Sequence, residues 1–377
     1  MNFTAFLLAA ASAASMGTAF AQTKTLYVGQ VAPLTGPAAS IGVPLTQAAH
    51  AYFARVNEGG GIAGHRIVLV DRDDGFKPEN TLAEVEKLLG ERAPVALINV
   101  VGAPNNGDLV TKGVLDANNL VVVGAFTGAT TVRTLKNPNM FFVRASVADE
   151  ARKMVDQVMT LGMTRIGLVH ANDAFGKDAK GFVEAALGER KRTLAGAAMY
   201  EPATIDVQQA VAALRSADAQ AILIFGTGPA AAKFVVEYKK AGGGAMLIAN
   251  SSTSPEVMAK NAGNELARGV GLVQVVPPLS KVTVPVVREY LDTLRRYGNP
   301  EWMPSPYGLE GFIAAKLLAE GIRRSGPNPS RDSIAKALGR IEQLDVGGLT
   351  LNYRNGSREG LKSVDIGIMG SNGRLMN

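Results

Sequence analysis

The sequence predicts an α/β protein built from two compact units, on three observations. The chain has 377 residues and a mass of 39.4 kDa, more than one hydrophobic core usually accommodates. It combines 42 glycines with 6% aromatic residues, which suits tight strand-to-helix turns better than an aromatic-rich β-sandwich. Short apolar runs also alternate with stretches of helical periodicity, which is typical of βα units on a parallel sheet.

Two βα series follow one another along the chain. The first has predicted strands at 26–31, 67–70, 95–101 and 120–125, with helices at 46–57, 78–90 and 105–118. The second has predicted strands at 166–170, 197–200, 221–225 and 246–249, each separated by a candidate helix. We therefore expect two doubly wound parallel sheets.

The alternation of strands and helices is interrupted at two places, which indicate domain boundaries. The first lies near 141–145, where Ser146 and Asp149 have the spacing of a capping box and open a predicted helix over 150–161. The second lies at Pro277 and Pro278, which stop regular structure before a helix over 284–297. Helices over 307–325 and 330–339, a glycine-rich hairpin and a strand near 364–369 complete the chain. This tail is too short for a third domain, so we expect it to cross between the other two.

The N-terminus predicts export. Residues 1–21 contain no charge, their apolar core spans 3–14, and they end in Ala19, Phe20 and Ala21, a pattern that signal peptidase cuts. We expect a signal peptide over 1–21 and a mature chain that is not inserted in the membrane but free in the periplasm. No Lys or Arg precedes the apolar core, so an N-terminal core helix is the alternative.

The amino-acid composition excludes several kinds of functional site. The net charge of +6 comes from scattered basic residues, which are typical of solvated helix faces, and we expect no nucleic-acid partner. The absence of cysteine excludes disulfides, thiolate metal sites and cysteine nucleophiles. The three histidines lie on unrelated segments without metal-ligand spacing, so we expect them to be structural. The sequence predicts neither a metal nor a cofactor.

Loops after the predicted strands of the first series are the first candidates for ligand contact. Ligands of open parallel sheets bind beyond the carboxyl ends of the strands, where helix N-termini offer free N–H groups. One such loop contains Ala103 and Asn105, and the next runs from Phe126 through Thr127 and Gly128 to Ala129. Small residues and a hydroxyl there predict a site for a carboxylate. Ordinary βα turns are the alternative.

The second series offers matching loops. Asp173 and Phe175 follow one strand, Gly228 follows another and Ser251 follows a third. Across a cleft, these residues would supply polar partners and an aromatic wall. Asp173 is also a good helix N-cap, which is the alternative to ligand contact.

Enzyme motifs are missing or misplaced. The glycines of 59–64 match a dinucleotide-binding pattern, but they follow a helix and precede a strand, so we expect a turn. Asp71, Asp73 and Asp74 form the densest acidic group; with no phosphate-binding loop beside them, we expect a cap or turn rather than a Mg²⁺ site. Paired catalytic residues are not apparent, and we expect no enzymatic activity.

Four segments together resemble the type I periplasmic binding proteins of the leucine/isoleucine/valine-binding branch, namely 28–36, 57–64, 71–74 with Pro78, and 172–177. The resemblance runs from about Thr25 to the C-terminus. It implies two α/β lobes joined by three crossovers, a ligand cleft that closes on binding, and delivery to an ABC permease. It also implies lobes made of 22–144 with 277–362 and of 145–276 with 363–377.

The resemblance also implies roles for the cleft loops. By position, 103–105 and 126–129 match the loops that hold the ligand carboxylate, and Phe175 matches the aromatic residue of the other lobe. The sequence departs from the branch near 250–252, where no acid stands for the ligand ammonium, and it lacks the tyrosine expected near Gly228 and the disulfide of the first lobe. Either Asp173 substitutes for that acid, or the ligand is an organic or aromatic acid without an α-amino group.

Two other functions stay open at this point. A sensory module would pass cleft closure to a membrane partner in signalling. A nucleotide-dependent α/β enzyme needs a glycine loop after the first strand, where the chain instead has Pro33, Leu34 and Thr35. A repressor with this lobe architecture is disfavoured because no helix-turn-helix precedes Thr25.

Overall fold

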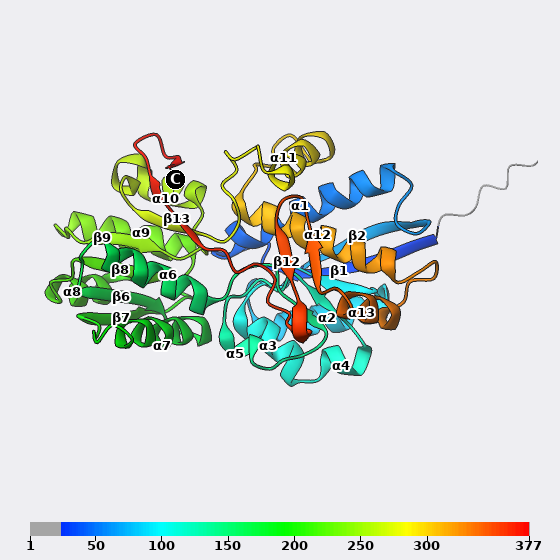
Figure 1. Ribbon diagram of the computed structural model, residues 1–377, viewed down its shortest axis with the longest axis horizontal. Coiled ribbons are helices and arrows are strands. Elements are labelled where there is room, and N and C mark those ends of the chain that lie inside the picture. The colour runs from blue at the N-terminus through cyan, green and yellow to red at the C-terminus, as the bar shows by residue number, and fades with distance from the viewer. Residues whose placement is uncertain (1–23, 377) are drawn as a thin grey trace, which may run out of the picture.

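The computed structural model describes residues 24–376, so the predicted signal peptide lies outside the described residues. The chain forms two lobes that lie side by side along the long axis of the molecule, each with a sheet and covering helices (Figure 1). The α/β fold class and the two-lobe architecture predicted from the sequence are confirmed.

Lobe 1 contains a five-stranded parallel sheet in the order β2-β1-β3-β4-β5, the doubly wound order with a switch point between β1 and β3. Its elements up to β5 are β1 (Lys24–Ala32), α1 (Ala39–Glu58), β2 (His65–Asp73), α2 (Pro78–Glu91), β3 (Ala96–Ile98), α3 (Ala103–Thr111), α4 (Val114–Asn118), β4 (Val122–Val123), α5 (Thr130–Arg133) and β5 (Met140–Phe141).

A later part of the chain returns to lobe 1 and packs against this sheet together with α1. Its elements are α11 (Pro285–Tyr297), α12 (Pro306–Arg324), α13 (Arg331–Gly339), the hairpin β11 (Gln343–Asp345) and β12 (Thr350–Asn352), and a 3₁₀ turn (Arg354–Gly356). Helices α2, α3 and α4 cover the opposite face. The sheet is therefore buried on both sides, which explains why its strands are almost continuously apolar.

Lobe 2 contains a seven-stranded sheet in the order β14-β13-β10-β9-β8-β6-β7, in which the pairings of β13 with β10 and with β14 are antiparallel and the others are parallel. Helices α6 and α7 cover one face, and α8, α9 and α10 cover the other. Its elements are α6 (Val147–Thr160), β6 (Ile166–Ala171), α7 (Ala174–Gly188), β7 (Gly196–Tyr200), α8 (Gln208–Ser216), β8 (Ala221–Phe225), α9 (Gly228–Lys240), β9 (Met246–Ala249), α10 (Pro255–Ala267), β10 (Gly271–Gln274), β13 (Asp365–Met369) and β14 (Leu375–Met376).

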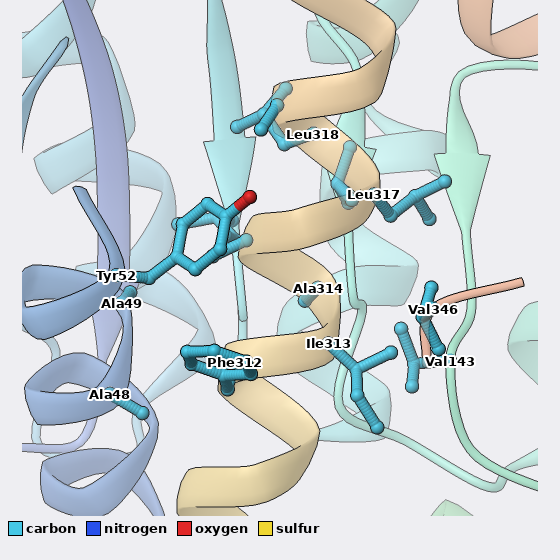
Figure 2. Close-up of a cluster of buried hydrophobic side chains, with 14 of the residues drawn as sticks. Ala48, Ala49, Tyr52, Val143, Phe312, Ile313, Ala314, Leu317, Leu318 and Val346 are labelled. Carbon is cyan, nitrogen blue, oxygen red and sulfur yellow. The ribbon is translucent and has the colours of Figure 1, made fainter. Parts of the chain in front are cut away.

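The largest core of lobe 1 lies between α1, α12 and the sheet. Figure 2 shows Phe312 of α12 next to Tyr52 of α1, and the two rings meet edge to face with centroids 5.1 Å apart. Gly311 lets the helices approach closely, because a Cβ there would lie 2.8 Å from the carbonyl oxygen of Leu45. This packing fixes the returning segment on lobe 1.

Three crossovers connect the lobes, after β5, after β10 and before β13. The first and third run beside each other, since the amide of Phe142 donates to the carbonyl of Arg358 (2.9 Å) and the amide of Leu361 donates to the carbonyl of Val143 (2.8 Å). In Figure 1 the third crossover is the red segment that passes from lobe 1 to lobe 2. The first and third crossovers are therefore joined to each other rather than independent linkers.

A buried cluster of polar side chains lies where the lobes meet. It is here called the hinge ion cluster and consists of the charged residues Arg144, Glu150 and Glu310 together with Ser251. Arg144 Nε lies 3.6 Å from Glu310 of lobe 1, and its Nη2 lies 3.8 Å from Glu150 of lobe 2 and donates to Ser251 Oγ. Glu150 accepts the backbone N–H and the hydroxyl of Ser251 at 2.8 and 2.7 Å. Burial raises the pKa of both carboxyls, that of Glu310 to about 7.

Most predicted elements are present, but some bounds differ: the strands predicted over 95–101 and 120–125 are only Ala96–Ile98 and Val122–Val123, and the helix predicted over 46–57 begins at Ala39. The capping box of α6 is present, with Ser146 and Asp149 bonded to each other's backbone N–H. The helix predicted over 105–118 is instead split into α3 and α4, because Gly113 adopts φ 71° between them. The short edge strand β14 lacks the apolar run on which strand prediction depends. Within residues 24–376, no helix is long and apolar enough to cross a membrane.

Phe312→Ala tests the core between α1 and α12. Phe312 is fully buried, so we expect the substitution to lower the free energy of unfolding by about 3 to 5 kcal/mol. The control is Met303→Ala, because Met303 is 73% exposed and its loss should change stability by less than about 0.5 kcal/mol. Urea denaturation measures both, and equal effects of the two substitutions would contradict this packing.

Glu310→Gln tests the hinge ion cluster through pH. Since folding raises the pKa of Glu310 from 4.5 to about 7, the folded state holds this proton more tightly than the unfolded state. Stability should therefore fall as pH rises between about 5 and 8, by up to about 3 kcal/mol from this group. The Gln variant cannot ionise, so urea denaturation across this range should show a flatter profile. Parallel profiles for wild type and variant would refute the raised pKa.

Candidate functional site

A cavity that is open to solvent lies between the two lobes; its empty volume, including the part open to solvent, is about 580 Å³. Here it is called the cleft. Lobe 1 and the first crossover contribute Ile41, Phe76, Val101, Gly102, Ala103, Pro104, Phe126, Thr127, Gly128 and Arg144. Lobe 2 contributes Ala171, Asp173, Phe175, Pro202, Gly226, Thr227 and Ser252. Most of these residues follow the carboxyl ends of parallel strands, the usual place for ligands in open α/β sheets.

Two helices begin at the cleft without a side-chain cap. Gly102 precedes α3 and Thr227 precedes α9, and neither helix has a side chain bonded to its first N–H groups. Gly102 has φ 105°, and a Cβ there would lie 2.4 Å from Asn105 Oδ1, so only glycine fits this turn. The free N–H groups and the positive ends of two helix dipoles favour a negatively charged ligand group.

Two hydroxyls face the cleft from opposite lobes. Thr127 Oγ1 accepts the backbone N–H of Ala129 at 3.1 Å, which leaves its own proton free to be donated. Thr227 Oγ1 is buried and has no hydrogen-bond partner among the described residues. A buried hydroxyl without a partner costs free energy, so a ligand oxygen or a water is the expected partner of Thr227.

Aromatic rings form the apolar walls. Phe126 packs edge to face against Tyr307 with centroids 5.9 Å apart, and Phe76 packs against the same cluster. Phe175 of α7 packs against the cores of both lobes, so it spans the cleft. Phe225 lies behind it, with ring centroids 6.3 Å apart. An apolar ligand body would be in contact with rings from both sides.

Arg144 and Asp173 are the charged residues of the lining. The Arg144 guanidinium stacks over the Phe126 ring, 4.1 Å from its centroid, and its side chain is only 3% exposed. The Asp173 carboxylate caps α7 by accepting the N–H of Gly176 at 2.8 Å. Burial raises the pKa of Asp173, which weakens it as a permanent negative charge.

The structure brings together six of the ten residues predicted to contact the ligand. In the cleft lining lie Ala103, Phe126, Thr127, Gly128, Asp173 and Phe175. They come from both lobes, as expected if the loops of the two βα series face each other across a cleft. The N-cap role expected as the alternative for Asp173 is also present, so this residue caps α7 and lines the cleft at once.

The other four predicted residues lie outside this lining. The Asn105 amide points into lobe 1, where it donates to Thr81 Oγ1 at 2.7 Å. Ala129 is fully buried at the start of α5. Gly228 packs against α10, since a Cβ there would lie 2.7 Å from Val257 Cγ1. Ser251 belongs to the hinge ion cluster, one residue before Ser252 of the lining.

Several lining residues were not predicted from the sequence. Thr227 and Ser252 are direct neighbours of the predicted Gly228 and Ser251. The prediction therefore identifies the correct loops but names the adjacent residue in each. No local sequence pattern indicates that Phe76 or Ile41 lines the cleft. For Arg144, the one indication in the sequence is its position at a predicted domain boundary.

The two rejected motifs have the structures expected of turns. The glycines of 59–64 connect α1 to β2, and three of them, Gly60, Gly61 and Gly64, adopt positive φ. Asp73 accepts the backbone N–H groups of Leu34 and Gly75, while Asp74 accepts that of Phe76. Among residues 24–376, no group of three or more His, Cys, Asp or Glu has the arrangement of a metal site.

Comparisons with known proteins agree with this architecture. A family model described as periplasmic binding protein matches residues 25–359. The Leu/Ile/Val-binding protein homolog 3 of Brucella melitensis is 25% identical over 365 residues, which is 96% of this chain and 95% of that protein.

Two solved structures extend the comparison. A substrate-binding periplasmic protein from Ralstonia solanacearum has a TM-score of 0.89 at 39% identity, over 93% of this chain and 99% of its own. A solute-binding protein of an ABC transporter from R. palustris, in complex with benzoate, shares the fold with a TM-score of 0.81 at 19% identity, over 94% of this chain and 95% of its own. With two lobes, a cleft between them and a family match over most of its length, the chain belongs to the periplasmic binding protein family.

Proposed function

We propose that this protein is the extracytoplasmic substrate-binding component of an ABC importer and captures a small carboxylate between its lobes. The observation that supports this most strongly is the cleft itself, which takes polar donors and aromatic walls from both lobes. The proposal places the mature chain in the periplasm, after cleavage of the predicted signal peptide.

The carboxylate end of the ligand would meet neutral donors and one cation. The starts of α3 and α9 supply free backbone N–H groups, and Thr127 and Thr227 supply hydroxyl protons. Arg144 adds a positive charge that solvent does not screen, because the side chain is almost fully buried. Fixed donors of this kind bind an anion without the entropic cost of ordering flexible side chains.

The body of the ligand would be apolar. Phe76 and Phe126 of lobe 1 and Phe175 of lobe 2 line the cleft, together with Ile41. Burying an apolar group between them gains about 25 cal/mol per Å² of surface removed from water. The benzoate complex of the R. palustris protein, which shares this fold, is consistent with an aromatic carboxylate.

Amino acids are the second candidate, and Asp173 is the observation that favours them. Its carboxylate lines the cleft and makes no ion pair with any described residue, so a ligand ammonium is a possible partner. The Brucella melitensis relative is named as a homologue of Leu/Ile/Val-binding proteins. Against this, the acid is also the N-cap of α7, and burial raises its pKa.

Transport follows from binding rather than from bond chemistry. A ligand that contacts both lobes favours the closed state by the free energy of the contacts it makes only there. A permease would recognise the closed arrangement, and ATP hydrolysis would take place in the transporter. The lobes would rotate about the three crossovers, the first and third of which are linked by backbone hydrogen bonds.

Thr227→Val and Phe175→Ala test the cleft by calorimetry with benzoate and with leucine. Thr227→Val removes a hydroxyl without removing a helix cap, and we expect about tenfold weaker binding of whichever ligand binds. Phe175→Ala should weaken binding by at least about tenfold through lost apolar contact. Thr131→Val, at an exposed threonine, is the matched control and should leave the affinity unchanged. Unchanged affinity in both cleft variants, or turnover of the ligand, would overturn the proposal.

Asp173→Asn separates the two ligand classes. Asparagine still caps a helix, so the fold of α7 is retained. If the ligand carries an ammonium, we expect calorimetry to show more than about tenfold weaker binding, because a buried charge loses its partner. If the ligand is a carboxylate without an amino group, binding should be equal or tighter. The second result is the one that the helix-cap geometry of Asp173 predicts.

A further inference from the structure

A second cavity, here called the basic cavity, lies on lobe 1 beside the hinge. Its empty volume is about 1150 Å³, including the part open to solvent, and it shares no lining residue with the cleft. Two segments form its walls, one from α5 to the residue after β5 (132–142) and one around the 3₁₀ turn (354–359). The second segment leads directly into the third crossover, as Figure 1 shows.

Positive charge dominates this cavity. Its lining contains the cations Arg133, Lys136, Arg354 and Arg358 and a single acid, Glu359. Glu359 is already paired with Arg133 at 2.5 Å. The other three cations make no ion pair with any residue in 24–376. The cavity therefore contains about three uncompensated positive charges, which repel one another and favour an anion.

Two of the three unpaired cations are positioned by contacts that leave their charge uncompensated. Arg358 lies over the Phe141 ring, 4.7 Å from its centroid, and Nη1 donates to the carbonyl of Ser357 at 3.1 Å. Arg354 Nη2 donates to the amide oxygen of Gln343 at 2.8 Å. These acceptors are neutral. The guanidinium groups are thus held in place while their charge stays available to a ligand.

Arg133 is the buried cation of the basic cavity, and several contacts hold its side chain in place. Its side chain is only 4% exposed and stacks over the Phe142 ring, 4.2 Å from the centroid. Nη2 donates to backbone carbonyls of the first crossover, 2.9 Å to that of Arg144 and 3.3 Å to that of Ala145. Nε is buried and has no hydrogen-bond partner among the described residues. This buried arginine links the lining of the basic cavity to the backbone of the first crossover.

We propose that the basic cavity is a second binding site that takes a small polyanion with two or more negative charges. Phosphate or carboxylate oxygens would bind between Lys136 of one wall and Arg354 and Arg358 of the other. Arginine forks match the oxygens of both groups, whereas a neutral or singly charged ligand would leave cations unpaired. The ligand would link lobe 1 to the segment that enters the third crossover.

The test is calorimetric titration of the full mature chain at low salt with inorganic pyrophosphate and, separately, with citrate. The double variant Lys136→Ala, Arg354→Ala removes two exposed cations that form no ion pair, so its thermal midpoint should equal that of the wild type. We expect it to bind the polyanion at least about tenfold more weakly. Arg66→Ala is the matched control, because Arg66 is exposed on β2, outside the cavity lining, and it should bind as the wild type does.

The two probes identify the source of the anion. Tighter binding of pyrophosphate indicates a phosphate-bearing ligand, and tighter binding of citrate indicates a polycarboxylate. Both support the site if the double variant weakens the binding and added salt weakens it further. Absence of binding to the wild type, or equal binding to the double variant, would overturn the proposal. Equal binding would place the anion at Arg144 in the cleft or elsewhere.

Discussion

The structure depends on one buried cation, Arg144, at the point where the lobes meet. A buried guanidinium needs opposite charges nearby, and it has one in each lobe: Glu310 lies 3.6 Å away on one side and Glu150 3.8 Å away on the other, where Ser251 Oγ also accepts a hydrogen bond from it. The ring of Phe126 supports its face. Since removing one member would leave an uncompensated buried charge, the cluster fixes where the lobes join and which end of the cleft is positive.

This constraint determines the character of the cleft. Arg144 lines the cleft with its charge shared with the hinge ion cluster, and Asp173 is held as a helix cap. The rest of the polar lining consists of backbone N–H groups and two threonine hydroxyls, and the walls are aromatic. Such a surface discriminates by shape and by the placement of a few donors. The same crossovers that carry Arg144 also pass beside the basic cavity, and Arg133 bonds to the carbonyl of Arg144. Both proposed sites therefore border the crossovers that connect the lobes.

Much of this could be predicted from sequence, because parallel strands buried on both faces give continuous apolar runs and helices between them keep their period. The strand-end loops with Thr127 and Phe175 were predicted for the same reason. Local patterns do not reveal which way a side chain turns at a helix start, so Asn105 was expected in the cleft but bonds inward to Thr81. Contacts between distant segments, such as Arg144 with Glu310, have no local signature at all.

A cleft with these donors and these aromatic walls should hold a small anion with an apolar body. Mass spectrometry of the compound that the natively purified protein retains can check this. The structure predicts a stoichiometric small carboxylate with an aromatic or aliphatic body. A retained sugar, nucleotide or cationic compound would contradict it.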